Sequence, residues 1–107
     1  MTDQKKTRRQ MLEEFVTTKP DDAFSRYGLA MECMNSGDAA AADTHFSALL
    51  ERNADYIPAY LMYAQLLARE SRTSEAKQIL STGIAAAAKK GDQHASSEMK
   101  ALLNDLS

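Results

Sequence analysis

The sequence has little of what a catalytic or metal site requires. Its only cysteine, Cys33, cannot form an internal disulfide, which fits a reducing compartment, and we expect it to be buried and unreactive. The four glycines are isolated from one another, so they form no phosphate-binding loop. Near His45 and His94 there is no cysteine or carboxylate that would complete a zinc site or a catalytic triad, and we expect both histidines at the surface or at a helix end. The sequence therefore predicts a protein that is not an enzyme, with no catalytic residue, no metal and no cofactor.

A strong charge of one sign and long apolar runs are also absent. The 107 residues carry a net charge of −2, so nothing favours nucleic acid or an anionic membrane as a partner. No apolar run approaches the roughly 18 residues of a membrane-spanning helix. The first ten residues, MTDQKKTRRQ, lead into charged residues and not into the apolar stretch of a signal peptide. We therefore expect a cytoplasmic protein that binds neither nucleic acid nor a membrane.

What the sequence does contain is an internal repeat. Between Asp55 and Lys90, apolar residues recur at helical spacing on both sides of a polar turn at residues 71–73, which predicts two amphipathic helices. Moving this stretch back by 34 residues aligns small residues with small ones and large with large ones. The aligned pairs include Ala64 with Ala30, Ala76 with Ala42, Leu80 with Phe46 and Ile84 with Leu50.

Turn and cap residues divide the whole chain into helices. Proline, glycine and aspartate mark the ends of these helices, because they stop one helix or cap the next. We expect helices over about residues 4–18, 22–35, 39–52, 57–70, 74–89 and 93–106. We also expect one folded domain with four parts: a basic N-terminal arm or helix that resembles half a repeat (1–21), a first repeat (22–56), a second repeat (57–90) and a C-terminal capping helix (91–107). The basic run at residues 5–9 suits the solvated start of a helix, with an anionic contact as the alternative.

The two central segments resemble tetratricopeptide repeats, and the resemblance covers about two-thirds of the chain. It rests on Leu29-Ala30, Gly37-Asp38, Ala42 and Phe46 in the first segment, and on Tyr60, Tyr63-Ala64, Ala76 and Leu80 in the second. The chain departs from the family pattern at four positions. Arg26 stands where the family favours a large aromatic residue, Ala54 and Ala88 where it favours proline, and Gly83 where it favours alanine.

The resemblance implies an all-α fold, a right-handed superhelix of antiparallel helix hairpins. In this family the first helix of each repeat lines a concave groove that receives a peptide or helix of another protein. The positions carried over to this groove are Phe24, Tyr27, Gly28, Met31, Met34 and Asn35 from the first repeat, and Leu61, Met62, Gln65, Ala68 and Arg69 from the second. The resemblance therefore implies a protein–protein interaction scaffold with a protein or peptide partner.

The groove residues are mostly apolar, which indicates the kind of partner. Relatives that grip the acidic C-termini of heat-shock chaperones hold lysines and asparagines at the positions that are Tyr27, Met31 and Met62 here, so we do not expect that ligand. Methionine side chains are flexible and polarisable and adapt to varied apolar surfaces. A groove of this composition favours the apolar face of an amphipathic helix.

Two alternatives to an open groove remain, and one alternative to the fold. The C-terminal helix, with an apolar stripe of Met99, Leu102, Leu103 and Leu106, can fold into the groove or pack on its edge and make the groove residues ordinary core. Two copies of the chain can bury their apolar faces against each other, because a large exposed apolar patch is unusual in a monomer. This homodimer is the second functional hypothesis, a homo-oligomerisation module. A plain bundle of helical hairpins is the alternative for the fold.

Overall fold

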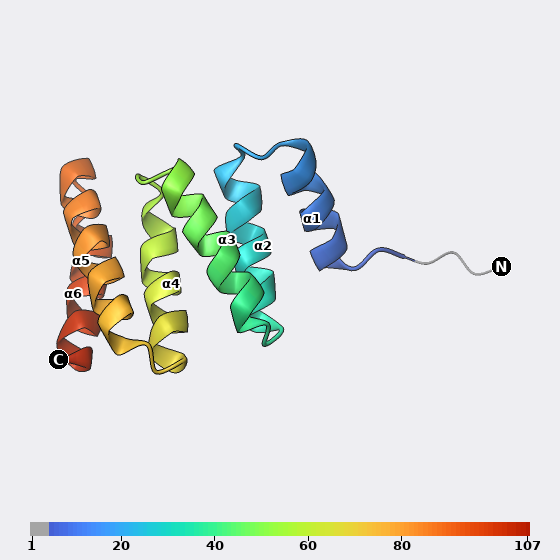
Figure 1. Cartoon of the computed structure of the whole chain (residues 1–107). Coiled ribbons are helices and arrows are strands. Elements are labelled where there is room, and N and C mark those ends of the chain that lie inside the picture. The colour runs from blue at the N-terminus through green and yellow to red at the C-terminus, as the bar shows by residue number, and fades with distance from the viewer. Residues whose placement is uncertain (1–4) are drawn as a thin grey trace.

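The computed structural model describes residues 5–107, and this part of the chain consists of six α-helices without strands. They are α1 (Arg8–Thr18), α2 (Ala23–Asn35), α3 (Ala39–Arg52), α4 (Ile57–Arg69), α5 (Thr73–Lys90) and α6 (Gln93–Leu106). Figure 1 shows the helices side by side in chain order, from α1 at one end to α5 and α6 at the other. The molecule is elongated, with principal extents of 55 × 28 × 20 Å. The predicted all-α fold is confirmed.

The helices begin and end at the residues whose local chemistry requires it. Asp22, Asp38 and Asp92 each accept a hydrogen bond from a backbone N–H group in the first turn of α2, α3 and α6. After α2 and α5 the chain turns through Gly37 and Gly91, which have φ values of +84° and +74°. This left-handed conformation strains any residue with a Cβ atom, and it accounts for glycine at both turns.

The first helix starts later than the sequence suggested. The hydroxyl of Thr7 accepts from the N–H of Gln10, and the Gln10 side chain accepts from the N–H of Thr7, which forms a capping box. The helix therefore begins at Arg8, and Lys5 and Lys6 precede it. The predicted start at Gln4 lies outside the described residues.

The 34-residue period of the sequence is also the period of the structure. The helix α2 begins at Ala23 and α4 begins 34 residues later at Ile57, while α3 begins at Ala39 and α5 begins 34 residues later at Thr73. Two helical hairpins, α2/α3 and α4/α5, thus follow each other in register. The division of the chain at residues 21, 56 and 90 stays a prediction, since helix bounds alone do not define repeats.

Small and large side chains alternate in the core between these helices. Ala30, Ala42, Ala64 and Ala76 are fully buried, and they let the helices of each hairpin approach closely. Phe46 fills the space between the two hairpins, with its ring stacked on that of Tyr63 at a centroid distance of 5.4 Å. Each buried side chain of this size contributes about 1.5–3 kcal/mol, so this alternation accounts for much of the stability.

Gly83 lies where α5 touches two other helices at once. A Cβ atom placed on Gly83 would lie 2.6 Å from Cβ of Tyr60 on α4 and 2.6 Å from Sδ of Met99 on α6. Both distances are shorter than any van der Waals contact. The glycine found where the family favours alanine is therefore explained by the tight packing of these three helices.

The two ends of the helix row differ in polarity. At the C-terminal end, α6 buries Met99 against α5 and presents polar residues outward. At the N-terminal end, α1 buries Val16 but leaves Met11 and Phe15 about half exposed. Arg8 also lies on α1, and its guanidinium pairs with Glu32 on α2 at 3.1 Å.

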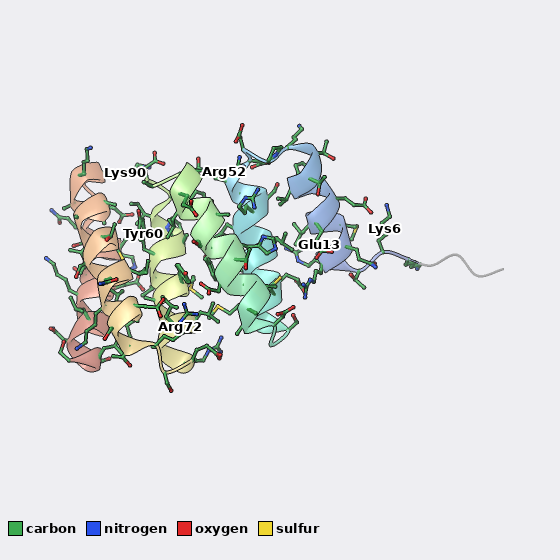
Figure 2. All side chains as sticks on the ribbon, viewed as in Figure 1. Lys6, Glu13, Arg52, Tyr60, Arg72 and Lys90 are labelled. Atoms are coloured by element: carbon green, nitrogen blue, oxygen red, sulfur yellow. The ribbon has the colours of Figure 1, made fainter. Side chains whose placement is uncertain are left out.

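Ion pairs and hydrogen bonds connect neighbouring elements at two opposite edges of the row of helices. At one edge Arg52 pairs with Asp21 at 2.7 Å, and Lys90 donates to the backbone oxygen of Asp55 at 3.2 Å; Figure 2 shows Arg52 and Lys90 on this side. At the opposite edge Arg72, also labelled in Figure 2, donates to the carboxylate of Asp43 at 3.0 Å.

The Asp43 carboxylate also accepts a hydrogen bond from the hydroxyl of Tyr63. Burial and this hydrogen bond to Asp43 raise the pKa of Tyr63, so the phenol stays protonated and keeps donating. Asp43 thus joins α3 to α4 through Tyr63 and to the start of α5 through Arg72.

Candidate functional site

A pocket opens on the face built by α2, α4 and α6, and it encloses about 290 Å³. We call it the α4–α6 pocket, because most of its wall comes from these two helices. Its apolar wall consists of Tyr27 from α2, Ile57, Pro58, Leu61 and Met62 from α4, and Ala95 and Met99 from α6. Its polar rim consists of Asp92, His94 and Glu98 at the start of α6.

The sequence of α4 explains why an apolar surface remains here. One face of α4 packs into the core through Tyr60, Tyr63 and Ala64, all of them buried. Leu61 and Met62 lie next to these residues in the chain, on the adjoining face, where they are only half-buried. The helix is therefore apolar over a wider arc than its core contacts need, and the excess forms the pocket wall.

The structure brings together three of the predicted groove residues, Tyr27, Leu61 and Met62, in one pocket wall. The ring of Tyr27 also packs against Tyr56 at a centroid distance of 5.4 Å, which fixes its position. Burial raises the pKa of Tyr27, so its hydroxyl is neutral at physiological pH.

The other predicted groove residues lie outside this wall. Phe24 is 76% exposed in the first turn of α2, and Arg69 is exposed at the last position of α4. Met31 and Gln65 are half-buried. Met34 is only 8% exposed and belongs to the core, so it is not available to a partner.

Sequence reasoning found only part of what α6 supplies to the pocket. Residues 91–107 were predicted to cap the last repeat, with packing of their Met99 stripe in the groove or on its edge as an alternative, but Ala95, His94 and Glu98 were not expected to line a pocket. Ile57 and Pro58 were noted only as the start of a helix. The 34-residue period could have predicted the position of α6. A helix that follows α5 in register lies beside α4, just as α4 lies beside α2.

The helix α6 does not lie across the pocket. It packs mainly along α5, where Met99 is 1% exposed, and it reaches α4 only with one side. The pocket is therefore bounded by α6, while Leu61 and Met62 keep exposed area.

Charge on the rim of the pocket comes from α6. The Asp92 carboxylate caps α6 by accepting from the N–H of Ala95 at 3.0 Å. The Glu98 carboxylate lies 3.3 Å from Nε2 of His94, one helical turn earlier, and the two form an ion pair only when the imidazole is protonated. The formal charges on the rim are therefore negative.

The two histidines differ in environment. His94 is exposed, as expected. His45 on α3 is half-buried, and its buried Nδ1 atom has no hydrogen-bond partner in the described part of the chain. Burial lowers the pKa of His45, and the cations Arg26 and Arg9 lower it further. The expectation of a surface histidine is wrong here, because α3 packs along α2 and part of the His45 side chain is covered.

Neither a metal site nor a membrane span emerges from the described residues. Between residues 5 and 107 no three His, Cys, Asp or Glu side chains come together in a way that could hold a metal ion. In the same range no helix is both long and apolar enough to cross a bilayer. Cys33 is fully buried, and burial raises the pKa of its thiol, which disfavours the reactive thiolate.

Comparisons with known proteins agree with this architecture. A family profile described as "Tetratricopeptide repeat" matches residues 34–106. A TPR repeat-containing protein of Pseudomonas aeruginosa is 28% identical over 95 residues, which is 89% of this chain and 90% of that protein. Because the profile matches more than half of the chain, the chain belongs to the tetratricopeptide repeat family.

Solved structures support the same assignment. The solution structure of a tetratricopeptide repeat domain protein from Salinibacter ruber superimposes with a TM-score of 0.78 at 32% identity, covering 82% of this chain and 89% of that one. A protein of Bordetella parapertussis superimposes with a TM-score of 0.80 at 24% identity, covering 95% of this chain and 89% of that one. At this identity the similarity supports the fold alone. The fold is that of a protein–protein interaction module, a class that in general binds proteins or peptides.

Proposed function

We propose that this chain binds a peptide or an amphipathic helix of another protein in the groove formed by α2, α4 and α6. The observation that carries the proposal is the α4–α6 pocket, an apolar hollow of about 290 Å³ walled by aromatic, leucine and methionine side chains. This volume lies at the lower end of the range for small-molecule sites, about 300–1,000 Å³, and one or two anchoring side chains of a partner can fill it. A few such anchors carry most of the free energy of a protein interface.

The placement of Leu61 and Met62 supports an open groove. A residue required by the core is fully buried, as Leu67 of the same helix is, whereas these two are half-buried. Leaving two large apolar side chains partly in water costs free energy that a partner recovers by covering them. The wall of the pocket is apolar and its polar side chains lie on one rim at the start of α6, which supports binding over catalysis.

A second copy of the chain is the competing occupant of the groove. The apolar wall alone suits either a foreign helix or the same face of another molecule, so solution mass separates the two. Sedimentation over a wide concentration range should give a monomer. A dimer that dissociates on dilution and that a groove substitution breaks would favour homo-oligomerisation.

Met62→Glu tests the groove directly. We expect helical peptides selected on the wild-type protein from a displayed library to lose binding to Met62→Glu by about tenfold or more, because a carboxylate in an apolar anchor site is desolvated without a partner. Helical content and melting temperature should change little, since the side chain is only half-buried. The matched control is Gln78→Glu, which adds the same charge at an exposed position of α5 and should leave binding unchanged.

Two outcomes would count against the proposal. If Met62→Glu unfolds the protein, Met62 belongs to the core and the groove is not free. If the selected peptides bind Met62→Glu and Gln78→Glu as well as the wild type, the partner site lies on another surface.

A further inference from the structure

The rim of the α4–α6 pocket carries charge of one sign. Its formally charged residues are Asp92 and Glu98, and no lysine or arginine lines the pocket. Their carboxylates lie at the start of α6 and nearly two turns further along, beside the apolar wall made by Met62 and Leu61. The pocket is therefore apolar in its depth and acidic on one side.

No lysine or arginine of residues 5–107 neutralises this acidity. Elsewhere carboxylates are commonly paired with arginine, as Asp21 is with Arg52 at 2.7 Å and Asp38 with Arg9 at 2.9 Å. Across residues 5–107, by contrast, no lysine or arginine lies within ion-pair distance of Glu98 or Asp92, and the only ion-pair partner of Glu98 is the imidazole of His94. The carboxylate of Glu98 is thus free to meet a cation from outside.

From this geometry we infer that the partner of the groove is a basic amphipathic helix. Its apolar face places an anchor in the α4–α6 pocket, and a lysine or arginine one helical turn from the anchor faces Glu98. The inference rests on the proposed function and adds the charge of the partner to it. An acidic helix brings carboxylates against Glu98 and Asp92 and is repelled, as is the phosphate backbone of a nucleic acid.

The helical spacing supports this match. On a helix, residues three or four apart lie about 5–6 Å from one another on the same side, so a basic residue at that distance from the anchor stays at the rim while the anchor enters the pocket. Lysine and arginine also have long apolar stems that can lie along the pocket wall while their charged ends remain in water. A partner helix with neutral polar residues in place of the lysine or arginine would gain only the apolar contact of its anchor.

Two synthetic helical peptides of about 15 residues, or about four turns, test the inference. Both carry leucine at positions i, i+3, i+4 and i+7, and the remaining face holds lysine and alanine in one peptide and glutamate and alanine in the other. Their affinities for the full chain are measured by calorimetry at low salt. The protein variants are Glu98→Lys and the matched control Glu51→Lys, which makes the same change of net charge on the exposed side of α3.

The lysine peptide should bind the wild type about threefold to tenfold more tightly than the glutamate peptide, the range expected for one or two exposed charge pairs. Glu98→Lys should abolish this preference, because the rim then carries one charge of each sign, while Glu51→Lys should leave it within about twofold. Met62→Ser, which removes an apolar contact without adding charge, should weaken both peptides.

The results separate this inference from the proposed function. If both peptides bind equally well and Met62→Ser weakens both, the groove binds apolar helices and the inferred charge of the partner is wrong. If Glu51→Lys changes the preference as much as Glu98→Lys, the attraction comes from net charge and not from the rim, which also overturns the inference. If neither peptide binds, the groove proposal and the inference fail together.

Discussion

Substituting Gly83 by alanine should destabilise this protein, although alanine is the better helix former. An added Cβ atom would lie 2.6 Å from Cβ and 2.8 Å from Cγ of Tyr60, and 2.6 Å from Sδ of Met99. The sulfur sits near the end of a flexible side chain and can move aside. The Cβ and Cγ atoms of Tyr60 lie next to the backbone of α4, so the clash with them is relieved only if α4 and α5 move apart.

The balance of two opposing terms gives the expected magnitude. Replacing glycine by alanine within a helix stabilises by about 0.8–1 kcal/mol. Overpacking a well-filled core costs about 1–3 kcal/mol, and we expect the upper part of this range because Tyr60 is 3% exposed and its ring has no space to retreat into. The net effect should be a loss of about 1–2 kcal/mol, which lowers the melting temperature by about 4–8 °C for each kcal/mol in a domain of this size.

Gly28 provides a matched control in the other hairpin. A Cβ atom at Gly28 would meet only Cδ2 of Leu12 on α1, at 3.5 Å, which is an ordinary contact. Gly28→Ala should therefore gain the helix term without the packing cost and stabilise by about 0.5–1 kcal/mol. Urea and thermal unfolding followed by circular dichroism measure both variants. A Gly83→Ala protein as stable as the wild type, or more stable, would refute the close packing of α4, α5 and α6.

Two further predictions concern buried polar groups. Tyr63→Phe removes the hydroxyl that donates to the Asp43 carboxylate and should cost about 1 kcal/mol of stability, measured by urea unfolding; no loss would mean that the hydrogen bond contributes nothing net. His45 has a pKa below the ordinary value of 6.5 in the fold, because of burial and Arg26, so the unfolded chain takes up a proton at a higher pH than the folded one. Stability should therefore fall as the pH drops below about 6.5, and His45→Gln should flatten this fall. An unchanged pH profile in His45→Gln would assign the effect to other groups.

Much of the fold followed from local sequence features. Asp38 caps α3, Gly91 ends α5 and Pro58 stands in the first turn of α4, each at the place that its own chemistry favours. The 34-residue period predicted which helices form hairpins, because aligned small residues such as Ala30 and Ala64 mark where helices approach closely.

The candidate site was predicted less completely than the fold. Tyr27, Leu61 and Met62 were expected in the groove and line the α4–α6 pocket. Met34 was expected there too but lies in the core, since a position carried over from a family says which side of a helix a residue occupies and not how deeply its neighbours cover it. Met99 was taken for part of a cap, and it forms a wall of the pocket.

The sequence by itself determined the helices, their ends and their pairing, because caps, turns and apolar periodicity act between residues close in the chain. Only the tertiary structure decided how α6 sits against α4 and α5, and therefore where the pocket opens and which charges surround it. That placement depends on contacts between distant residues, above all Gly83 with Tyr60 and Met99, where a single missing Cβ atom lets three helices meet.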